Sequence, residues 1–429
     1  MTNLAIEAAY GRRRQLRRGV FKRRLRRVEA RVGEDGGVQR LSLSSGGYLY
    51  ERDGAVDRQQ ASEATEQRSL RVLPGQLVVN PMWLTGGSIA VSRVAGAVSP
   101  DYRVFELDPS LDPRFLHHLL RSQPYRDQYN LFVRANTTFD RRIQQEDLDQ
   151  LPLWLPDHQE QRRIADFLDD RVARIDRIIA ARRSQMEHAN AASLRDSFDT
   201  VRGSSHRERR PSGLAWLGTI PRDWALRPVN AEFQVDLGKM LDEKRQSGLH
   251  AIPYLRNTNV QWDRVDLADL KSMDITPDER PRYTVEPGDL LICEGGQPGR
   301  AAIWPGGPEP LGFQKALHRA RSRGNSRPEW LLECLRAATA LNVFAVEYEQ
   351  ATIGHLTNEQ LRSFKVPCPE LQFQDEALAE LRITQERARL TIAGFARSID
   401  LLNEYKESLI TAAVTGELDV TTAGSGIPG

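Results

Sequence analysis

The clearest pattern in the chain is a long stretch in which apolar residues recur at alternating steps of three and four. It runs from about Gln374 to Val414 and holds over more than four heptads. This spacing is typical of the a/d seam of a coiled coil. Gly416 follows where a glycine commonly ends a helix. We therefore expect a helix of about 40 residues, roughly 60 Å long at 1.5 Å per residue.

A related stretch lies earlier in the chain, between about 161 and 201, apolar in its first half and polar in its second. Asp157 followed by Glu160 resembles a capping box at its start. Helices from duplicated halves should pair antiparallel about a two-fold axis. The alternative is that each stripe packs on its own globular domain, but a helix of about 60 Å outruns a domain of that size. The expected seam residues are Leu168, Val172, Ile175, Ile179, Met186, Leu378, Leu381, Ile392, Phe395, Ile399, Leu402 and Leu409.

Landmarks outside these helices repeat at the same offset in the numbering. Pro74-Gly75 matches Pro287-Gly288, and Gln161 matches Gln374, so both pairs differ by 213 in residue number. A register shared by separate landmarks indicates a tandem duplication rather than chance matches. The period far exceeds that of solenoid repeats. The sequence thus predicts a globular part followed by a long helix, twice over.

The globular parts contain short β-like runs among Gly and Pro turns, such as Gln76–Val79 and Asp289–Ile292. Short helices are expected at Pro113–Gln123 and Pro328–Leu341. These elements predict mixed α/β domains with modest sheets. The expected organisation is a first domain (1–157), a first long helix (158–203), a second domain (204–370), a second long helix (371–420) and a flexible tail (421–429).

Composition places the chain among ordinary folded proteins. It has 429 residues, of which 40% are hydrophobic and 28% charged, so disordered and collagen-like classes are excluded. Three scattered cysteines are too few for a disulfide framework, and a reducing cytoplasm fits best. The longest uncharged run, Val72–Ser92, carries prolines and a Gly-Gly pair, so we expect no membrane span. No signal peptide is visible.

Charge is spread unevenly along the chain. The net charge is only +2, yet residues 11–31 hold eleven Arg or Lys residues against one acid, Glu29. A block of this kind favours a phosphate-bearing partner such as nucleic acid. The alternative is a solvated arm or a ribosome-like tail. The arginines of the block expected to bind DNA are Arg12, Arg13, Arg14, Arg17, Arg18, Arg23 and Arg24.

Polar residues in the second globular part also suit nucleic-acid recognition. Arginine reads guanine, and Asn or Gln reads adenine, in the major groove. The loop Gly295–Arg300 resembles a phosphate-binding loop but lacks the following Gly-Lys-Ser/Thr; it could still approach a DNA backbone. For any single residue here, the alternative is an ordinary turn or surface group. The candidates are Arg256, Asn257, Asn259, Gln297, Arg300, Gln314 and Lys315.

Local spacing yields no catalytic set. Asn80-Pro81-Met82-Trp83 is similar to a methyltransferase loop but has no cofactor-binding glycine loop before it. Pro100-Asp101 with Glu106 is similar to a nuclease site, but Asp108 stands where a lysine is needed. The adjacent His117 and His118 would point about 100° apart on a helix, so a shared metal is disfavoured. These observations predict a binding protein rather than an enzyme.

Motifs in the second half are more specific than these patterns. Trp216–Pro221 (Trp-Leu-Gly-Thr-Ile-Pro) with Trp224 opens the second globular part, and Val285–Leu291 follows it. Ile353–Leu356 then leads into Val366–Pro369, and the last helix ends with Glu407–Leu418. With the duplicated plan, these motifs make residues 11–420 resemble the DNA-specificity (S) subunit of a type I restriction–modification system.

This resemblance implies two tandem α/β target-recognition domains, each followed by a long helix. The helices would pair as an antiparallel coiled coil with pseudo-two-fold symmetry. Each domain would read one half of a split, asymmetric site in double-stranded DNA, and the coiled coil would act as a ruler for the spacer. The same helices would seat two methyltransferase subunits, and nuclease/translocase subunits would join them. S-adenosylmethionine, ATP and Mg would be bound by those partners, leaving this chain without a cofactor or metal.

The first half departs from the family pattern. It lacks the Trp-Leu-Gly opening and carries the arginine block instead, and Gln76 stands where the second copy has Asp289. Two other functions stay open. One is a coiled-coil scaffold or adaptor of a phage-defence complex, whose DNA binding would be sequence-blind and purely salt-sensitive. The other is a stand-alone nuclease or methyltransferase, which needs a catalytic set that the sequence does not offer.

Overall fold

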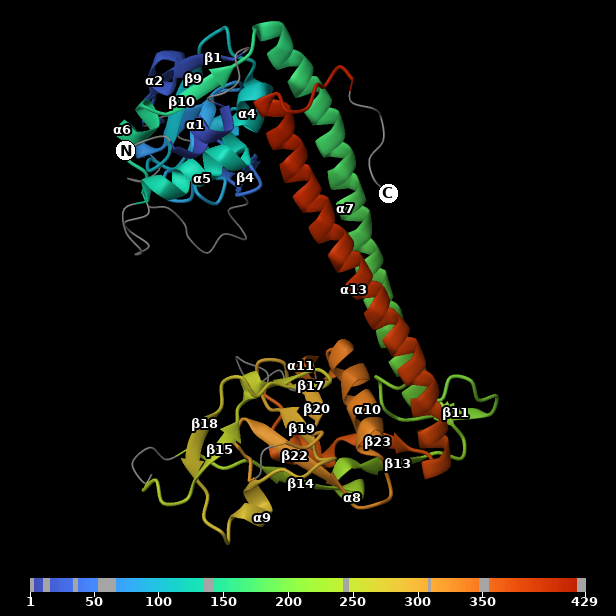
Figure 1. Ribbon diagram of the computed structural model, residues 1–429. Coiled ribbons are helices and arrows are strands. Elements are labelled where there is room, and N and C mark those ends of the chain that lie inside the picture. The colour runs from blue at the N-terminus through green and yellow to red at the C-terminus, as the bar shows by residue number, and fades with distance from the viewer. Residues whose placement is uncertain are drawn as a thin grey trace. The chain divides into compact units, whose positions relative to one another are not determined.

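The computed structural model describes residues 4–10, 16–33, 38–52, 67–133, 142–241, 247–307, 310–346 and 355–422 (Figure 1). The chain divides into two compact units. Unit 1 comprises residues 1–182 and 397–429, and unit 2 comprises residues 183–396. Each unit contains one globular domain and a part of both long helices.

The domain of unit 1 is built on a four-stranded antiparallel sheet in the order β2-β9-β6-β7. Its central strand β6 is buried at every position, as its Leu-Val-Val sequence requires. The strands of this sheet are β2 (Leu25–Val28), β6 (Leu77–Val79), β7 (Ile89–Val91) and β9 (Arg103–Leu107). Three further pairs accompany it: β1 (Arg17–Val20) with β10 (Pro152–Leu155), β3 (Leu41–Leu43) with β4 (Leu49–Glu51), and β5 (Leu70–Val72) with β8 (Gly96–Val98).

Short helices complete this domain. Asp112 caps α4 by accepting the backbone N–H groups of Arg114 and Phe115, and Pro113 fits the first turn. The predicted helix over 113–123 ends at Arg121, because Ser122 is extended and a second helix starts at Gln123. The helices are α1 (Leu4–Tyr10), α2 (Phe21–Arg24), α4 (Pro113–Arg121), α5 (Gln123–Phe132) and α6 (Gln145–Asp149).

The domain of unit 2 repeats this sheet in the order β14-β22-β19-β20. A second sheet, β18-β15-β21, has no three-stranded counterpart among the described strands of unit 1. The strands of the two sheets are β14 (Phe233–Leu237), β15 (Ala251–Leu255), β18 (Lys271–Asp274), β19 (Leu290–Cys293), β20 (Ala301–Ile303), β21 (Gly312–Phe313) and β22 (Leu317–Ser322).

The remaining elements of unit 2 are short pairs and helices. The pairs are β11 (Arg209–Pro211) with β12 (Thr219–Pro221), β13 (Ala225–Pro228) with β23 (Lys365–Cys368), and β16 (Val260–Gln261) with β17 (Arg264–Val265). The helices are α8 (Val229–Glu232), η2 (Asn257–Asn259), α9 (Arg280–Tyr283), α10 (Pro328–Ala340), α11 (Val343–Val346) and α12 (Asn358–Ser363). The helix predicted over 328–341 is thus confirmed to within one residue at its end.

The topology confirms the duplication and locates a change within it. Strands β6 and β19 begin at 77 and 290, and strands β10 and β23 begin at 152 and 365, so both pairs keep the offset of 213. Strands β1 and β13, however, begin at 17 and 225, an offset of only 208. The two copies therefore differ in length between β1 or β13 and the strand that follows the Pro-Gly turn.

The Pro-Gly turns themselves are equivalent. Gly75 and Gly288 both have positive φ, at 86° and 91°, where a side chain would be strained. Each donates its N–H to a backbone carbonyl 2.8 Å away. The Gln76 side chain accepts the N–H of residue 73 at 2.8 Å, and the Asp289 side chain accepts that of residue 286 at 2.7 Å. The change from Asp to Gln in the first copy thus preserves the turn.

Two long helices, α7 (His158–Val201) and α13 (Leu371–Thr415), follow the two domains. In unit 1, Ile175 and Ile179 of α7 share a core with Leu402 and Leu409 of α13. In unit 2, Gln385 Nε2 of α13 donates to Ser197 Oγ of α7 at 3.2 Å.

Within each unit, therefore, an early part of one helix meets a late part of the other. That arrangement is antiparallel and confirms the coiled-coil prediction. None of the predicted seam residues is exposed. Neither long helix, nor any other described helix, is long and apolar enough to cross a membrane.

Candidate nucleic-acid interface

The arginine block is part of the folded domain of unit 1. Residues 17–28 form β1, α2 and β2, so the alternative of a solvated arm is wrong for this segment. Arg12, Arg13 and Arg14 lie outside the described residues. Phe21 and Leu25 are buried and anchor the block to the core of the domain.

Acidic residues neutralise part of this block. Arg18 pairs with Glu7 at 2.9 Å, and Arg24 lies 3.5 Å from Asp108. Arg26 pairs with Glu106 in the same way. These arginines are therefore less available to phosphate than the sequence pattern indicates.

Other residues of the block remain exposed. Arg17, Lys22 and Arg23 have no ion-pair partner among the described residues, and all three are exposed. At the offset of 208 that relates β1 to β13, the second copy has Ala225, Asn230 and Ala231. These three positive charges are thus present in unit 1 and absent from the corresponding positions of unit 2, and in unit 1 they can contact phosphates.

In unit 2, the predicted DNA-binding residues come together on three neighbouring loops. These interface loops are Arg256–Asn259, Gly295–Arg300 and Gln314–Lys315. Asn257 Nδ2 donates to the Gly295 carbonyl at 2.8 Å, and Arg300 donates to both oxygens of Asn257 at 3.1 Å. The Gln314 N–H donates to the Leu255 carbonyl at 2.9 Å. The fold therefore gathers residues that are far apart in the sequence.

Two of these residues are held within the protein. Asn259 is only 4% exposed, and its amide donates to the Asp266 carbonyl while its oxygen accepts the Arg256 N–H, both at 2.9 Å. Arg256 donates to the Asp269 carboxylate at 2.6 Å. The buried Asn259 side chain thus stabilises the conformation of its loop, and the Asp269 carboxylate neutralises the charge of Arg256.

Of the predicted residues on the interface loops, Gln297 and Lys315 are exposed. His355 is also exposed and lies against this surface, because a Cβ added to Gly295 would be 3.1 Å from its Nδ1. The Leu356 N–H donates to the Glu294 carbonyl at 2.7 Å and holds His355 there. Sequence reasoning missed His355 as an interface residue, because it is distant in the sequence from all three loops.

The loop at the equivalent place in unit 1 joins β6 to β7. It contains Asn80-Pro81-Met82-Trp83, which forms an ordinary turn: the Asn80 side chain accepts the Met82 N–H at 3.2 Å, and the Asn80 carbonyl accepts the Trp83 N–H at 3.2 Å. Trp83 is 53% exposed. A large exposed aromatic side chain on such a loop suits stacking or groove contacts with DNA.

Arg121 joins this loop to the β3–β4 hairpin. Its guanidinium donates to the Gly87 carbonyl of the loop and, at 3.1 Å, to the Ser45 carbonyl of the hairpin. The hairpin carries the exposed Tyr48 and Tyr50, whose ring centroids lie 6.1 Å apart. Burial lowers the pKa of Arg121 to about 10, so it stays charged at neutral pH. The aromatic residues were missed because single exposed aromatics carry no sequence pattern.

The residues that resembled catalytic sites are engaged in structural contacts. Asp101 pairs with Arg142 at 2.9 Å, and Glu106 pairs with Arg26. His118 lies 3.2 Å from Asp169 on α7 and connects α4 to the long helix. Within the described chain, no group of three or more His, Cys, Asp or Glu residues could hold a metal ion.

No protein-family model matches this sequence, and no curated protein matches it. Solved structures do match. One is a chain from a study of complex assembly and conformational transition in the type I R-M system: it is 15% identical, with a TM-score of 0.68 over 94% of this chain and 99% of that chain. Another is the HsdS subunit from Thermoanaerobacter tengcongensis, 16% identical, with a TM-score of 0.51 over 96% of this chain and all of that chain.

This chain has the HsdS fold. The similarity spans both domains and both helices, so the predicted fold class is confirmed as a whole. The HsdS fold includes the first domain despite its missing Trp-Leu-Gly opening, because the sheet order survives that change.

One helix of the HsdS fold here carries apolar residues that remain uncovered. Ile383, Leu390 and Leu401 on α13 are each more than half exposed, although they alternate with the buried seam of the same helix. Ile383 and Leu390 are seven residues apart and so share one face of the helix, where they form a short apolar strip.

Proposed function

We propose that this chain is the DNA-specificity subunit of a type I restriction–modification complex. The observation that carries the proposal is the similarity in fold to type I R-M chains over 94% or more of the sequence. A second observation supports this proposal: each domain has loops whose exposed residues suit contacts with DNA. Each domain would recognise one half of a split, asymmetric site in double-stranded DNA.

The two domains would contact DNA with different residues. In unit 2, Gln297 would contact a base edge and Lys315 a phosphate. In unit 1, Arg17 and Arg23 would bind phosphates while Trp83 contacts the groove. The different chemistry of the two surfaces fits an asymmetric site, because identical surfaces would favour identical half-sites.

The long helices would seat two methyltransferase subunits, and nuclease/translocase subunits would join the complex. The exposed Ile383, Leu390 and Leu401 support a partner on α13, since burying them would be favourable. S-adenosylmethionine, ATP and Mg would bind to those partners in the cytoplasm. This chain would contribute recognition and no catalytic residue.

Methylation sequencing of single DNA molecules tests the proposal. Cells that contain the methyltransferase partner are compared with and without this chain. We expect a split motif to lose its methylation when the chain is removed. An unchanged pattern would contradict the proposal and favour a scaffold or adaptor, whose DNA binding would weaken with salt equally for all sequences.

A further inference from the structure

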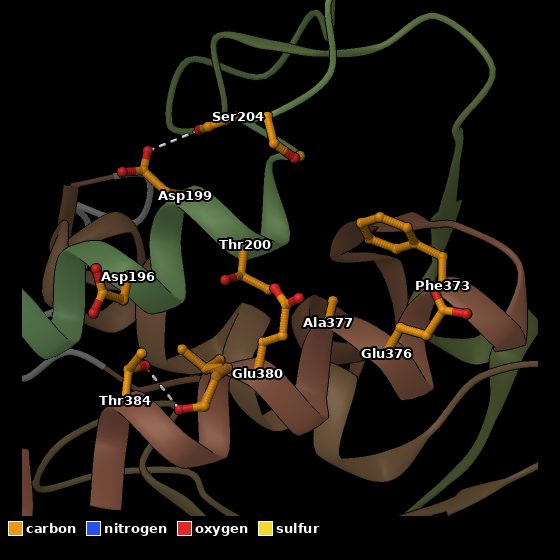
Figure 2. A pocket seen from close by; sticks show the side chains of 12 residues that line it. Asp196, Asp199, Thr200, Ser204, Phe373, Glu376, Ala377, Glu380 and Thr384 are labelled. Atoms are coloured by element: carbon orange, nitrogen blue, oxygen red, sulfur yellow. Dashed lines mark hydrogen bonds between the residues drawn. The ribbon is translucent and has the colours of Figure 1, made fainter. Parts of the chain in front are cut away.

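A groove of about 430 Å³ lies in unit 2 between the last turns of α7 and the first turns of α13 (Figure 2). Figure 2 shows Glu380 reaching from α13 toward Thr200 of α7. The apolar part of the groove is formed by Phe373, Ala377 and Leu381. Its acidic residues are Asp196, Asp199, Glu376 and Glu380.

These carboxylates are poorly compensated within the described chain. Asp199 accepts the Ser204 hydroxyl at 2.8 Å and lies 3.5 Å from Arg202. Asp196 and Glu380 have no hydrogen-bond or ion-pair partner among the described residues. Like charges gathered around one groove repel one another, so a cation that enters it is attracted to all of them.

The equivalent place in unit 1 has a different chemistry. At the offset of 213, each acidic residue of the groove has a counterpart in unit 1. These counterparts are Leu409 for Asp196, Ala412 for Asp199, Arg163 for Glu376 and Phe167 for Glu380. The duplication therefore preserved the helices and replaced all four acidic positions. The acidic groove is a property of one half of the chain.

In unit 1, the chain itself covers the equivalent place. Leu418 and Val420, which follow α13, pack against the core that contains the first turns of α7. The pKa of Asp419 between them is lowered first by hydrogen bonds from Thr421 and also by the charge of Arg163. A short segment of turns, with apolar residues on both sides of an opposite charge, thus fits this position on the fold.

In the described part of unit 2, the segment that follows α7 carries no apolar residue at the corresponding positions. At the same offset, Leu418, Asp419 and Val420 correspond to Ser205, His206 and Arg207. Of these three residues, only Ser205 lines the groove. The ring centroid of His206 lies 5.2 Å from that of Phe373. Of the apolar residues in the groove, Phe373 and Ala377 therefore remain partly exposed, while Leu381 is buried.

We propose that this groove binds a short basic segment of a protein partner, with a leucine-like side chain on the apolar floor and Lys or Arg beside it. The charge complements the four carboxylates, and the apolar residue takes the part of Leu418, which packs against the core of unit 1. The proposal rests on the proposed function, in which this chain works within a complex. DNA is a poor occupant because the carboxylates repel phosphate.

A peptide-binding measurement on the full chain tests this proposal. The probe is a fluorescein-labelled peptide with leucines flanked by lysines, followed by anisotropy at low and moderate salt. We expect D196N together with E380Q to weaken binding about tenfold, because removing two rim charges weakens a complementary contact. The matched control is E187Q with E404Q, which removes two exposed carboxylates from the same helices outside the groove and should leave binding unchanged.

Two further comparisons separate this site from general charge attraction. A probe with serines in place of the leucines should bind more weakly, since it cannot use the apolar floor. Binding of duplex DNA should be equal in the wild type and in the D196N/E380Q chain, which shows that the variant is folded. Equal binding of the leucine probe to both chains, or of the two probes to the wild type, would overturn the proposal without affecting the DNA-reading function.

Discussion

Gln161 and Gln374 make the same hydrogen bonds in the two halves of the chain. The side-chain oxygen of Gln161 accepts the N–H of Asp112 at 2.9 Å, and that of Gln374 accepts the N–H of Arg327 at 2.8 Å. Their amide groups donate to the carbonyls of residues 156 and 369 at 3.0 and 2.9 Å. Each glutamine thus ties the start of a long helix to the start of a domain helix.

Replacing Gln374 by leucine should loosen this junction in unit 2. The three side-chain hydrogen bonds with Ser326, Arg327 and Pro369 would be lost, and leaving their partner groups unsatisfied inside the protein costs about 1–3 kcal/mol. Hydrogen exchange should show faster exchange at the start of α10. The exposed Gln372 on the same helix gives the control Q372L, and equal exchange in both variants would contradict this role.

A second junction repeats with its charges reversed. Arg114 of α4 pairs with Asp169 of α7 at 3.2 Å, and Glu329 of α10 pairs with Arg382 of α13 at 3.2 Å. Arg114 and Glu329 each follow the proline that begins their helix. Asp169 and Arg382 differ by 213 in residue number and so occupy equivalent positions of the duplication. Each domain is thus matched in charge to its own helix and mismatched to the other.

This match should be measurable in unit 2. E329R would place two arginines together and reduce stability, whereas E329R with R382D would restore the arrangement of unit 1. Because these side chains are partly exposed, the coupling should be about 0.2–1 kcal/mol at low salt. A double-mutant cycle from urea unfolding measures it, and additive effects of the two changes would refute the pairing.

The long-range order of the molecule could be predicted from the sequence because it depends on repetition and periodicity. The seam from Leu168 to Leu409 and the constant offset between the two copies were visible as patterns. The heptad spacing of apolar residues repeats along a whole helix, and the difference in residue number repeats along a whole duplicated segment. The structure confirms the antiparallel pairing of the helices and the offset of 213 for β6 with β19 and β10 with β23, whereas β1 and β13 differ by only 208.

The candidate site was less predictable because exposure and pairing depend on tertiary contacts. Arg24 and Asn259 looked equally available in the sequence, yet Asp108 faces the first and backbone groups surround the second. Trp83 and His355 lay within sequence motifs that did not mark them as DNA contacts, and only the fold brings them to the surfaces where DNA could bind.

Acidification should weaken unit 2 through His318. This side chain is fully buried, its Nε2 lies 2.8 Å from the Leu356 carbonyl, and burial lowers its pKa. In the unfolded chain its pKa would be near the usual value of about 6.5. The unfolded state then binds a proton more readily, so this contribution to stability is present above about pH 6.5 and is lost as the pH falls below it.

H318Q keeps an amide that can donate to the same carbonyl but does not titrate in this range. The urea midpoint of unit 2 should therefore depend less on pH between about 7.5 and 5.5 than in the wild type. The exposed His188 on α7 provides the control H188Q, which should keep the wild-type dependence. Identical pH profiles for H318Q and the wild type would exclude His318 as the cause.

The interface loops of unit 2 predict two different effects on DNA binding. K315A should weaken binding to all sequences alike and reduce the salt slope by about 1, because one phosphate contact is lost. Q297A should cost about 1–3 kcal/mol on the cognate site and relax specificity at one base pair, because an amide reads a base edge. Binding titrations on a set of single-base variants of the site, at several salt concentrations, separate the two effects.

Asn259 supplies the internal comparison for these variants. Since its amide is bonded within the loop, N259A should lower the stability of unit 2 and weaken binding only through the displaced loop. At a temperature where N259A is folded, its specificity should stay close to that of the wild type. If N259A instead changed the preferred base while Q297A did not, the buried asparagine would be the reader, and the loop would have to open when DNA binds.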